Sequence, residues 1–301
     1  MNKEKADKYQ KLVKESQASY RDNPDDHKSN DIELVAPDIN IAVENGEVKI
    51  LDKGVSICKE INLYTYWQGL NYAEKTPDIT YLLVAQDWGN LAMGRNEFMK
   101  RIIAINNGTD LLYYDKATNI SETDDNLVEL FKVLEYNIDE HRYDELFFTN
   151  FCLGYRTGRE SGNMDNELMM KDAKNFRRLC EILEPKNILC LGKLTFECVY
   201  ESLKGDGERK PKGFRGSYNK FIETYGVNPI TVHISNSHTT RIFPLAHPGA
   251  MGMLNRAPGI KSDFPPDATK EEKKKKQSET KDRRLKVQKS DWQRVKDAVQ
   301  K

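Results

Sequence analysis

Three segments of this 301-residue chain end in side chains that could do chemistry together. One apolar, strand-forming run ends at Asp87, a second at Asn150 and a third at His247. A carboxylate, a side-chain amide and an imidazole supply an anion, a paired donor and acceptor, and a general acid or base. Ligands of open α/β sheets bind at the carboxyl ends of the strands. We therefore expect Asp87, Asn150 and His247 to meet at one sheet edge and form a site.

Each of these residues also has an ordinary structural explanation. An aspartate can cap a helix or close a turn, an asparagine can form a turn with its own backbone, and a lone histidine is most often a structural residue. Because three strand ends carry such side chains at once, the sequence favours a site over three independent structural roles.

Apolar runs and amphipathic segments alternate along the chain. Strands that alternate with helices indicate a parallel sheet covered on both faces. We therefore expect an α/β fold, a three-layer α/β/α sandwich around a central, mostly parallel four-stranded sheet. Strands are predicted near 80–85, 145–153, 187–192, 229–235 and 240–247, and helices over 126–136, 167–183 and 194–203.

Less regular segments surround this pattern. Residues 39–51 alternate weakly around Asn45-Gly46, which predicts an edge strand or a hairpin. Residues 57–67 have apolar positions at helical spacing. Residues 155–165 and 204–220 are polar or basic without apolar periodicity, so we expect surface loops, the first of them beside the site and carrying Arg156 and Arg159.

The two ends of the chain differ from its middle in composition. We expect a polar N-terminal extension over 1–50, the α/β/α domain over 51–260 and a basic helical tail over 261–301. The chain has no net charge, but residues 270–301 hold thirteen Lys/Arg and six Asp/Glu. Such a tail either tracks a polyanion by releasing counterions from phosphates or is solvated helix surface.

The cysteines are odd in number, widely spaced and without C-x-x-C spacing, which favours buried reduced thiols in a cytosolic protein. No run approaches the roughly 18 apolar residues of a membrane span, and no signal peptide is visible at the N-terminus. We therefore expect a cytoplasmic monomer that does not contact a membrane. The cysteines are Cys58, Cys152, Cys180, Cys190 and Cys198.

Four short motifs in order resemble those of the uracil-DNA glycosylase superfamily over residues 80–255. Ala85-Gln-Asp-Trp-Gly89 looks like its first motif, Thr149-Asn150 like its strand-end asparagine, residues 188–192 like its third strand, and His247-Pro-Gly249 like its His-Pro-Ser motif. Residues 149–192 are especially similar to the bacterial members that carry an iron–sulfur cluster.

Two departures from that family pattern matter. The cysteines are off the register of the cluster ligands, so we expect no cluster and no other cofactor or metal. Trp88 stands where the uracil-specific branch has proline, and Gly89 stands where that branch has the tyrosine that blocks a thymine methyl. The resemblance therefore leaves the preferred base open.

The resemblance implies a monofunctional DNA glycosylase, a hydrolase that acts on DNA in base excision repair and removes uracil or another damaged or deaminated base. It implies that Asp87 and His247 are catalytic. A base must leave the duplex to be reached, and apolar side chains can fill the vacated stack. Base-binding residues would be Gln86, Trp88, Gly89, Phe98 and Asn150, and DNA contacts would come from Met251 or Leu254 as a wedge and Arg256 on a phosphate.

Two alternatives come from other classes of protein. The Trp88-Gly89 pair and the lack of net charge also fit a protein on the same fold that binds DNA or a modified base without cleaving it. A small-molecule hydrolase would use Cys152 or Cys198 with a histidine, but neither cysteine lies in a recognisable nucleophile turn.

Overall fold

The centre of the protein is a five-stranded sheet in the order β5-β4-β7-β9-β8. Strands β4 (Tyr81–Ala85), β5 (Leu146–Asn150), β7 (Asn187–Leu191) and β9 (Thr239–Leu245) run parallel, and β8 (Ile230–His233) is antiparallel to β9. The computed structural model describes residues 3–29, 32–35, 41–44, 47–50, 78–87, 122–141, 143–157, 164–205, 207–235 and 237–301.

This sheet confirms the predicted α/β class and the mostly parallel arrangement, but the expected number of strands was wrong. The fifth strand is β8, which is joined to β9 by the short connection 234–238. A connection this short can only reverse the chain, because parallel strands need a crossover of a dozen or more residues. Strand β8 is therefore an antiparallel edge strand added to the four parallel ones.

Side chains alternate across the sheet and feed two separate cores. Leu82 and Val84 of β4 pack on one face, whereas Tyr81 and Leu83 pack on the other. The period of two is that of a β-strand, and both sets are apolar because both faces are covered. The central strands are therefore continuous apolar runs, as the sequence predicted.

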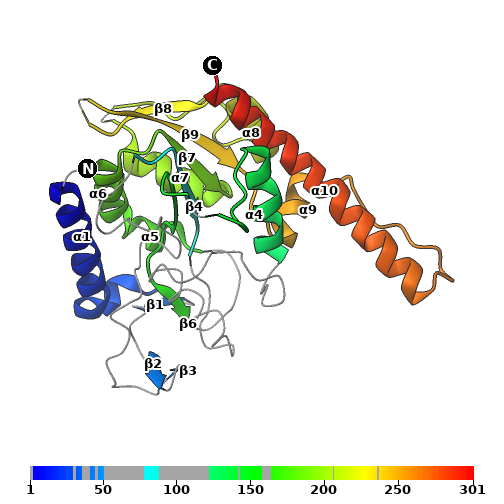
Figure 1. Cartoon of the computed structure of the whole chain (residues 1–301), viewed down its shortest axis with the longest axis horizontal. Coiled ribbons are helices and arrows are strands. Elements are labelled where there is room, and N and C mark those ends of the chain that lie inside the picture. Colours follow the sequence, from blue (N-terminus) through cyan, green and yellow to red (C-terminus); the bar gives the residue numbers. More distant parts are fainter. Residues whose placement is uncertain are drawn as a thin grey trace.

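Helices cover both faces of the sheet (Figure 1). One core includes residues of α1 (Lys3–Asp22), α5 (Asn166–Met170), α6 (Ala173–Leu183), α7 (Lys193–Leu203) and α8 (Tyr218–Val227). The second core, on the opposite face of the sheet, is formed by α4 (Glu122–Val133) and the long α10 (Lys270–Val299). The short α9 (Ala250–Arg256) contacts α10.

The N-terminal extension and the C-terminal tail expected from the sequence both contribute side chains to these cores. Tyr9 and Leu12 of α1 are buried against the sheet on one side. Trp292 and Val295 of α10 are buried on the other side. The tail is helical as expected, but its C-terminal half is part of the domain, because its own apolar positions recur at helical spacing.

A buried polar contact fixes the end of α1. The Tyr20 hydroxyl donates a hydrogen bond to Asp172 Oδ2, and the Leu153 amide donates to the same oxygen at 3.1 Å. Burial raises the pKa of Asp172 to about 7, against the lowering effect of these two donors. A carboxyl group in such a place favours its neutral form.

Smaller elements lie outside the main sheet. Strand β1 (Glu33–Val35) pairs antiparallel with β6 (Tyr155–Thr157), and a 3-10 turn (Pro24–His27) precedes β1. Strands β2 (Ile41–Glu44) and β3 (Glu47–Ile50) form the hairpin that was predicted as one of two options. The expected helix over 57–67 lies outside the described residues, whereas α8 begins inside the segment predicted as a basic loop.

Among the residues that the structure describes, no helix is both long enough and apolar enough to cross a bilayer.

Candidate functional site

The parallel strands place Asp87, Asn150 and His247 at one edge of the sheet. Asn150 is the last residue of β5, Asp87 lies two residues beyond β4, and His247 lies two residues beyond β9. Strands β4 and β5 are neighbours with Ala85 opposite Asn150, and β7 lies between β4 and β9. The three side chains predicted from the sequence therefore do come to the carboxyl end of the same sheet.

Backbone hydrogen bonds extend the pairing of β4 and β5 beyond the strands. The Phe151 amide donates to the Ala85 carbonyl at 2.8 Å, and the Cys152 amide donates to the Gln86 carbonyl at 2.9 Å. The chain leading to Asp87 is therefore held on one side by the chain that follows Asn150. Asn150 itself is buried, with 2% of its surface exposed.

Asp87 belongs to a buried ion pair that the sequence did not reveal. Arg156 Nη2 lies 2.5 Å from Asp87 Oδ2, and the two side chains are 3% and 6% exposed. The Gln86 side-chain amide donates to the same oxygen at 2.9 Å. Charge-assisted hydrogen bonds of this kind are short and hold a carboxylate in one orientation. The site carboxylate is thus oriented before any ligand binds.

The strand β6 is what brings Arg156 to this position. It pairs with β1 so that Arg156 lies opposite Leu34, and the Arg156 side chain is buried. We expected residues 155–165 to be a surface loop, and for 155–157 that expectation was wrong. A three-residue strand has too little periodicity to be recognised in a sequence, so nothing in the local pattern distinguished Arg156 from a surface arginine.

His247 is held as a neutral imidazole with a defined donor. The Gly249 amide donates to His247 Nδ1 at 3.0 Å. Burial lowers the pKa of His247, and the negative charge of Asp87 opposes this effect without reversing it. In a neutral imidazole whose Nδ1 accepts a hydrogen bond, the proton is on Nε2. His247 therefore presents an N–H donor on the side away from Gly249.

The loop that carries His247, residues 246–249 and hereafter the His247 loop, is hydrogen-bonded by side chains of α4 and α10, the two helices of the second core. The Gln288 side chain of α10 donates to the His247 carbonyl at 3.0 Å, and the Asn126 side chain of α4 donates to the Pro248 carbonyl at 2.7 Å. Asn126 and Gln288 are each 1% exposed. Buried amides that satisfy backbone carbonyls fix the loop conformation. Sequence reasoning missed both, because each lies on a helix that we assigned only to packing or to the tail.

Two glycines let this loop approach its neighbours closely. A Cβ atom at Gly249 would lie 2.8 Å from Thr123 Oγ1 and 3.0 Å from His247 Nδ1. At Gly252 it would lie 2.0 Å from the His247 carbonyl oxygen. Side chains at either position would therefore displace the histidine or the helix that follows it.

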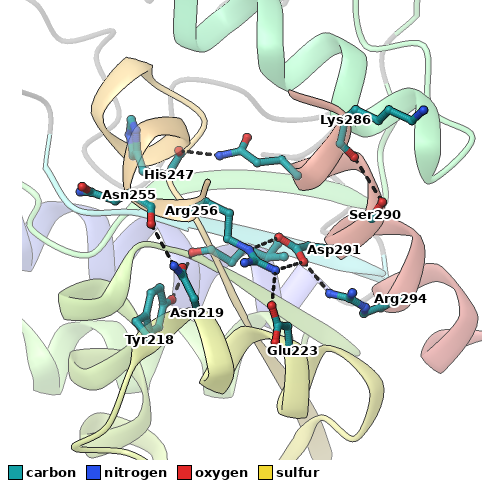
Figure 2. A network of polar contacts seen from close by, with 12 residues as sticks. Tyr218, Asn219, Glu223, His247, Asn255, Arg256, Lys286, Ser290, Asp291 and Arg294 are labelled. Atoms are coloured by element: carbon teal, nitrogen blue, oxygen red, sulfur yellow. Dashed lines mark hydrogen bonds and ion pairs between the residues drawn. The ribbon is translucent and has the colours of Figure 1, made fainter. Parts of the chain in front are cut away.

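The three predicted DNA contacts all lie on α9, and they differ in exposure. Met251 is exposed over 67% of its surface, and Leu254 is partly buried. Arg256 is buried and its guanidinium contacts Asp291 Oδ2 at 2.7 Å and Glu223 Oε1 at 3.1 Å (Figure 2). Arg256 therefore joins α9 to α10 and α8 inside the protein, and it is not at the surface where a phosphate contact was expected.

The remaining predicted base-binding residues cannot be placed. Trp88, Gly89 and Phe98 lie outside the described residues. Within the described residues, the site therefore consists of Asp87 with Gln86 and Arg156, Asn150, and the loop of His247 with the two side-chain amides that hold it.

The cysteines of the described part of the chain are chemically quiet. Burial raises the pKa of Cys198 to about 12 and that of Cys152 well above its ordinary value. Both are therefore thiols at neutral pH, and the thiolate is the nucleophilic form. This argues against the hydrolase alternative. Cys58 lies outside the described residues, and within them no three His, Cys, Asp or Glu side chains group as metal ligands.

One hollow among the described residues begins near the carboxyl end of β7, where α7 starts at Lys193. It is a cavity of about 450 Å³ beside α5 and α7, and its lining includes Lys193, Glu197, Glu201, Lys210 and Phe214. Its carboxylates already have partners, with Lys210 at 2.9 Å from Glu201 and Lys193 at 3.7 Å from Glu197. Arg215 also lines this hollow, so two carboxylates face three cations, and its lining residues include no histidine. The sheet edge, which has one, is therefore the stronger candidate for acid–base chemistry.

Comparison with protein-family profiles and with curated protein sequences finds no match to this chain.

Proposed function

We propose that this protein is a DNA N-glycosylase of the uracil-DNA glycosylase superfamily, which hydrolyses the bond between deoxyribose and uracil or another damaged or deaminated base. The observation that supports this most is the His247 arrangement. A neutral imidazole has its Nε2–H donor fixed by the Gly249 amide at the same sheet edge as the Asp87 carboxylate.

The reaction requires an anion near the sugar and a hydrogen-bond donor near the base, on opposite sides of the N-glycosidic bond. Cleavage of an N-glycosidic bond builds positive charge on the sugar and negative charge on the departing base. In this proposal Asp87 stabilises the sugar cation and orients the attacking water, while His247 Nε2–H donates to a carbonyl oxygen of the base. The Asn150 amide holds the edge of the base by one donor and one acceptor.

Neutrality of His247 suits this role. A donor aimed at a developing oxyanion works without proton transfer when its hydrogen bond is preorganised in a water-poor site. Burial lowers the pKa of His247, so the imidazole stays neutral at pH 7 and keeps its one proton on Nε2. We expect the rate of base release to be independent of pH above about 6.5, the ordinary pKa of histidine, and to depend on pH in more acidic solution, where His247 becomes protonated.

One observation favours the alternative of a protein that binds DNA or a modified base without cleavage. Asp87 is already engaged by Arg156 at 2.5 Å. A carboxylate neutralised by a guanidinium attracts a sugar cation less strongly than a carboxylate alone. The glycosylase proposal therefore requires that Asp87 remain effective in this ion pair, or that Arg156 turn to a DNA phosphate when DNA binds.

Base release from labelled oligonucleotides tests the proposal. Single- and double-stranded substrates would contain uracil, hypoxanthine, xanthine or a thymine mismatch. We expect wild type to release one of these bases, and Asp87→Asn and His247→Ala to lower the rate about a hundredfold or more. Matched controls are Asp78→Asn and His233→Ala, since both side chains are exposed at the opposite edge of the same sheet.

The outcomes separate the two candidates. Release that is lost in the two site variants while both remain folded, and kept in the two controls, supports the glycosylase. Absence of release from every substrate, with intact DNA binding by folded protein, supports the binding protein. Equal release by wild type and Asp87→Asn contradicts the proposed chemistry.

A further inference from the structure

The first eighteen residues of α10, 270–287, form an arm that projects from the body of the protein (Figure 1). Residues 270–279 are all exposed. Segment 257–269 runs beside the arm and is tied to it by Ser262 and Thr280, whose hydroxyl oxygens lie 2.8 Å apart. The arm has nine Lys/Arg and four Asp/Glu in a chain with no net charge.

The charges of the arm are sorted by face. Residues three, four or seven positions apart share a face of a helix, because 3.6 residues make one turn. Lys270, Lys273, Lys274 and Lys281 share one face that carries no acidic residue, and we call these four residues the lysine stripe. The other faces carry Glu271, Glu272, Glu279 and Asp282 together with Lys275, Arg283 and Lys286.

The lysine stripe continues the face by which α10 packs on the body. Lys274, Lys281, Gln288 and Val295 follow one another at seven-residue intervals. Val295 is fully buried in the second core, and Gln288 donates to the His247 carbonyl at 3.0 Å. Lys281 Nζ lies 3.6 Å from a carboxylate oxygen of Glu122, at the start of α4. The lysine stripe therefore lies on the face of α10 that is turned toward the candidate site.

The length of the arm matches a polymer that extends beyond the site. From Gln288 to Lys270 the helix rises about 27 Å, at roughly 1.5 Å per residue. Duplex DNA advances about 3.4 Å per base pair, so the arm spans about eight base pairs. Lys270, Lys273 and Lys274 form no ion pair with any described residue, so their ammonium groups are available to phosphates.

We propose that the lysine stripe binds the phosphate backbone of duplex DNA beside the nucleotide that occupies the site. This inference rests on the proposed function, since it assigns the partner of the same site. The straight helix of the arm (Figure 1) matches the straight path of a duplex better than the path of a flexible single strand. The stripe contributes affinity without sequence preference, because phosphate contacts carry no base information.

The test compares two triple variants that remove the same charge from opposite faces. The stripe variant is Lys270→Gln, Lys273→Gln and Lys274→Gln, and the control variant is Lys275→Gln, Arg283→Gln and Lys286→Gln. All six side chains are exposed, and Gln is about as good a helix former as Lys or Arg, so folding is preserved. Binding is measured by fluorescence anisotropy on an undamaged 20-base-pair duplex between about 50 and 200 mM salt.

We expect the stripe variant to bind about tenfold more weakly at the lowest salt or worse. Its slope of log affinity against log salt should be shallower by up to about 2.7, or 0.9 for each lost phosphate contact. The control variant should stay close to wild type. Equal losses in both variants, no loss in either, stronger effects on single-stranded than on duplex DNA, or no duplex binding by wild type would each overturn the proposal.

The use of undamaged DNA separates this proposal from the glycosylase. If the stripe variant binds like wild type while wild type still releases a base, the arm proposal fails and the enzyme stands. If the stripe governs DNA binding but no base is released, the arm proposal stands and the binding-protein alternative gains.

Discussion

The Asp87–Arg156 ion pair gives the sharpest quantitative prediction. The two side chains are 6% and 3% exposed, and their atoms are 2.5 Å apart. Removing one partner of a buried pair leaves an uncompensated charge and costs about 3–5 kcal/mol. We therefore expect Arg156→Met to lower the free energy of unfolding by about that amount, and Asp87→Asn to lower it comparably.

A double-mutant cycle isolates the interaction from other contacts of the two residues. Because the double variant leaves no unpaired charge, its loss should be smaller than the sum of the single losses by about 3 kcal/mol. The measurement is equilibrium unfolding in urea followed by circular dichroism, with the slope checked for constancy across variants.

An exposed arginine–carboxylate pair is the matched control. Arg177 Nε lies 3.1 Å from Glu181 Oε1, and these side chains are 40% and 43% exposed. Exposed pairs four residues apart in a helix contribute about 0.3–0.5 kcal/mol. A coupling of that size at Asp87 and Arg156 would refute the reasoning, because it would mean that solvent screens the pair.

Three further predictions concern the scaffold around the site. The pKa of Asp172 is raised to about 7, so its stabilising contribution is complete below pH 3.8 and is lost as the pH rises through 7. Asp172→Asn should therefore unfold less readily than wild type at pH 8, by on the order of 1 kcal/mol or more, and urea titrations at pH 5 and pH 8 check this. Gly252→Ala places a Cβ atom against the His247 carbonyl, so it should lower the free energy of unfolding by about 1–3 kcal/mol or more and slow any base release. Urea unfolding and base release, measured on the same preparation, check both effects. Trp292→Ala should lower the free energy of unfolding by about 3–5 kcal/mol, measured in thermal or urea unfolding, because this side chain of the expected tail is 1% exposed. A change under about 1 kcal/mol would contradict the packing of α10 in the second core.

The removal of the whole tail is therefore a poor test of DNA binding. Deleting residues from 270 onward also removes Trp292 and Gln288, and with them part of the second core and one clamp of the His247 loop. Point substitutions on the exposed arm avoid this difficulty because they leave the packed half of α10 intact.

The sequence by itself determined the strands and the residues at their ends. Apolar runs that stop at Asp87, Asn150 and His247 are local patterns, and a parallel sheet brings its strand ends to one edge whatever the loops do. For the same reason the α/β class and the amphipathic α6 could be predicted, since each depends on periodicity within a few neighbouring residues.

Only the tertiary structure decided which residues support that edge. Arg156 reaches Asp87 across 69 positions of sequence, and Gln288 reaches His247 across 41. Nothing in a local pattern distinguishes a buried arginine or glutamine with such a partner from a solvated one. The sequence of α10 likewise did not show that its second half packs in the core, because its basic first half is typical of a solvated helix. The sequence named the groups that could do chemistry, and long-range packing decided how they are held.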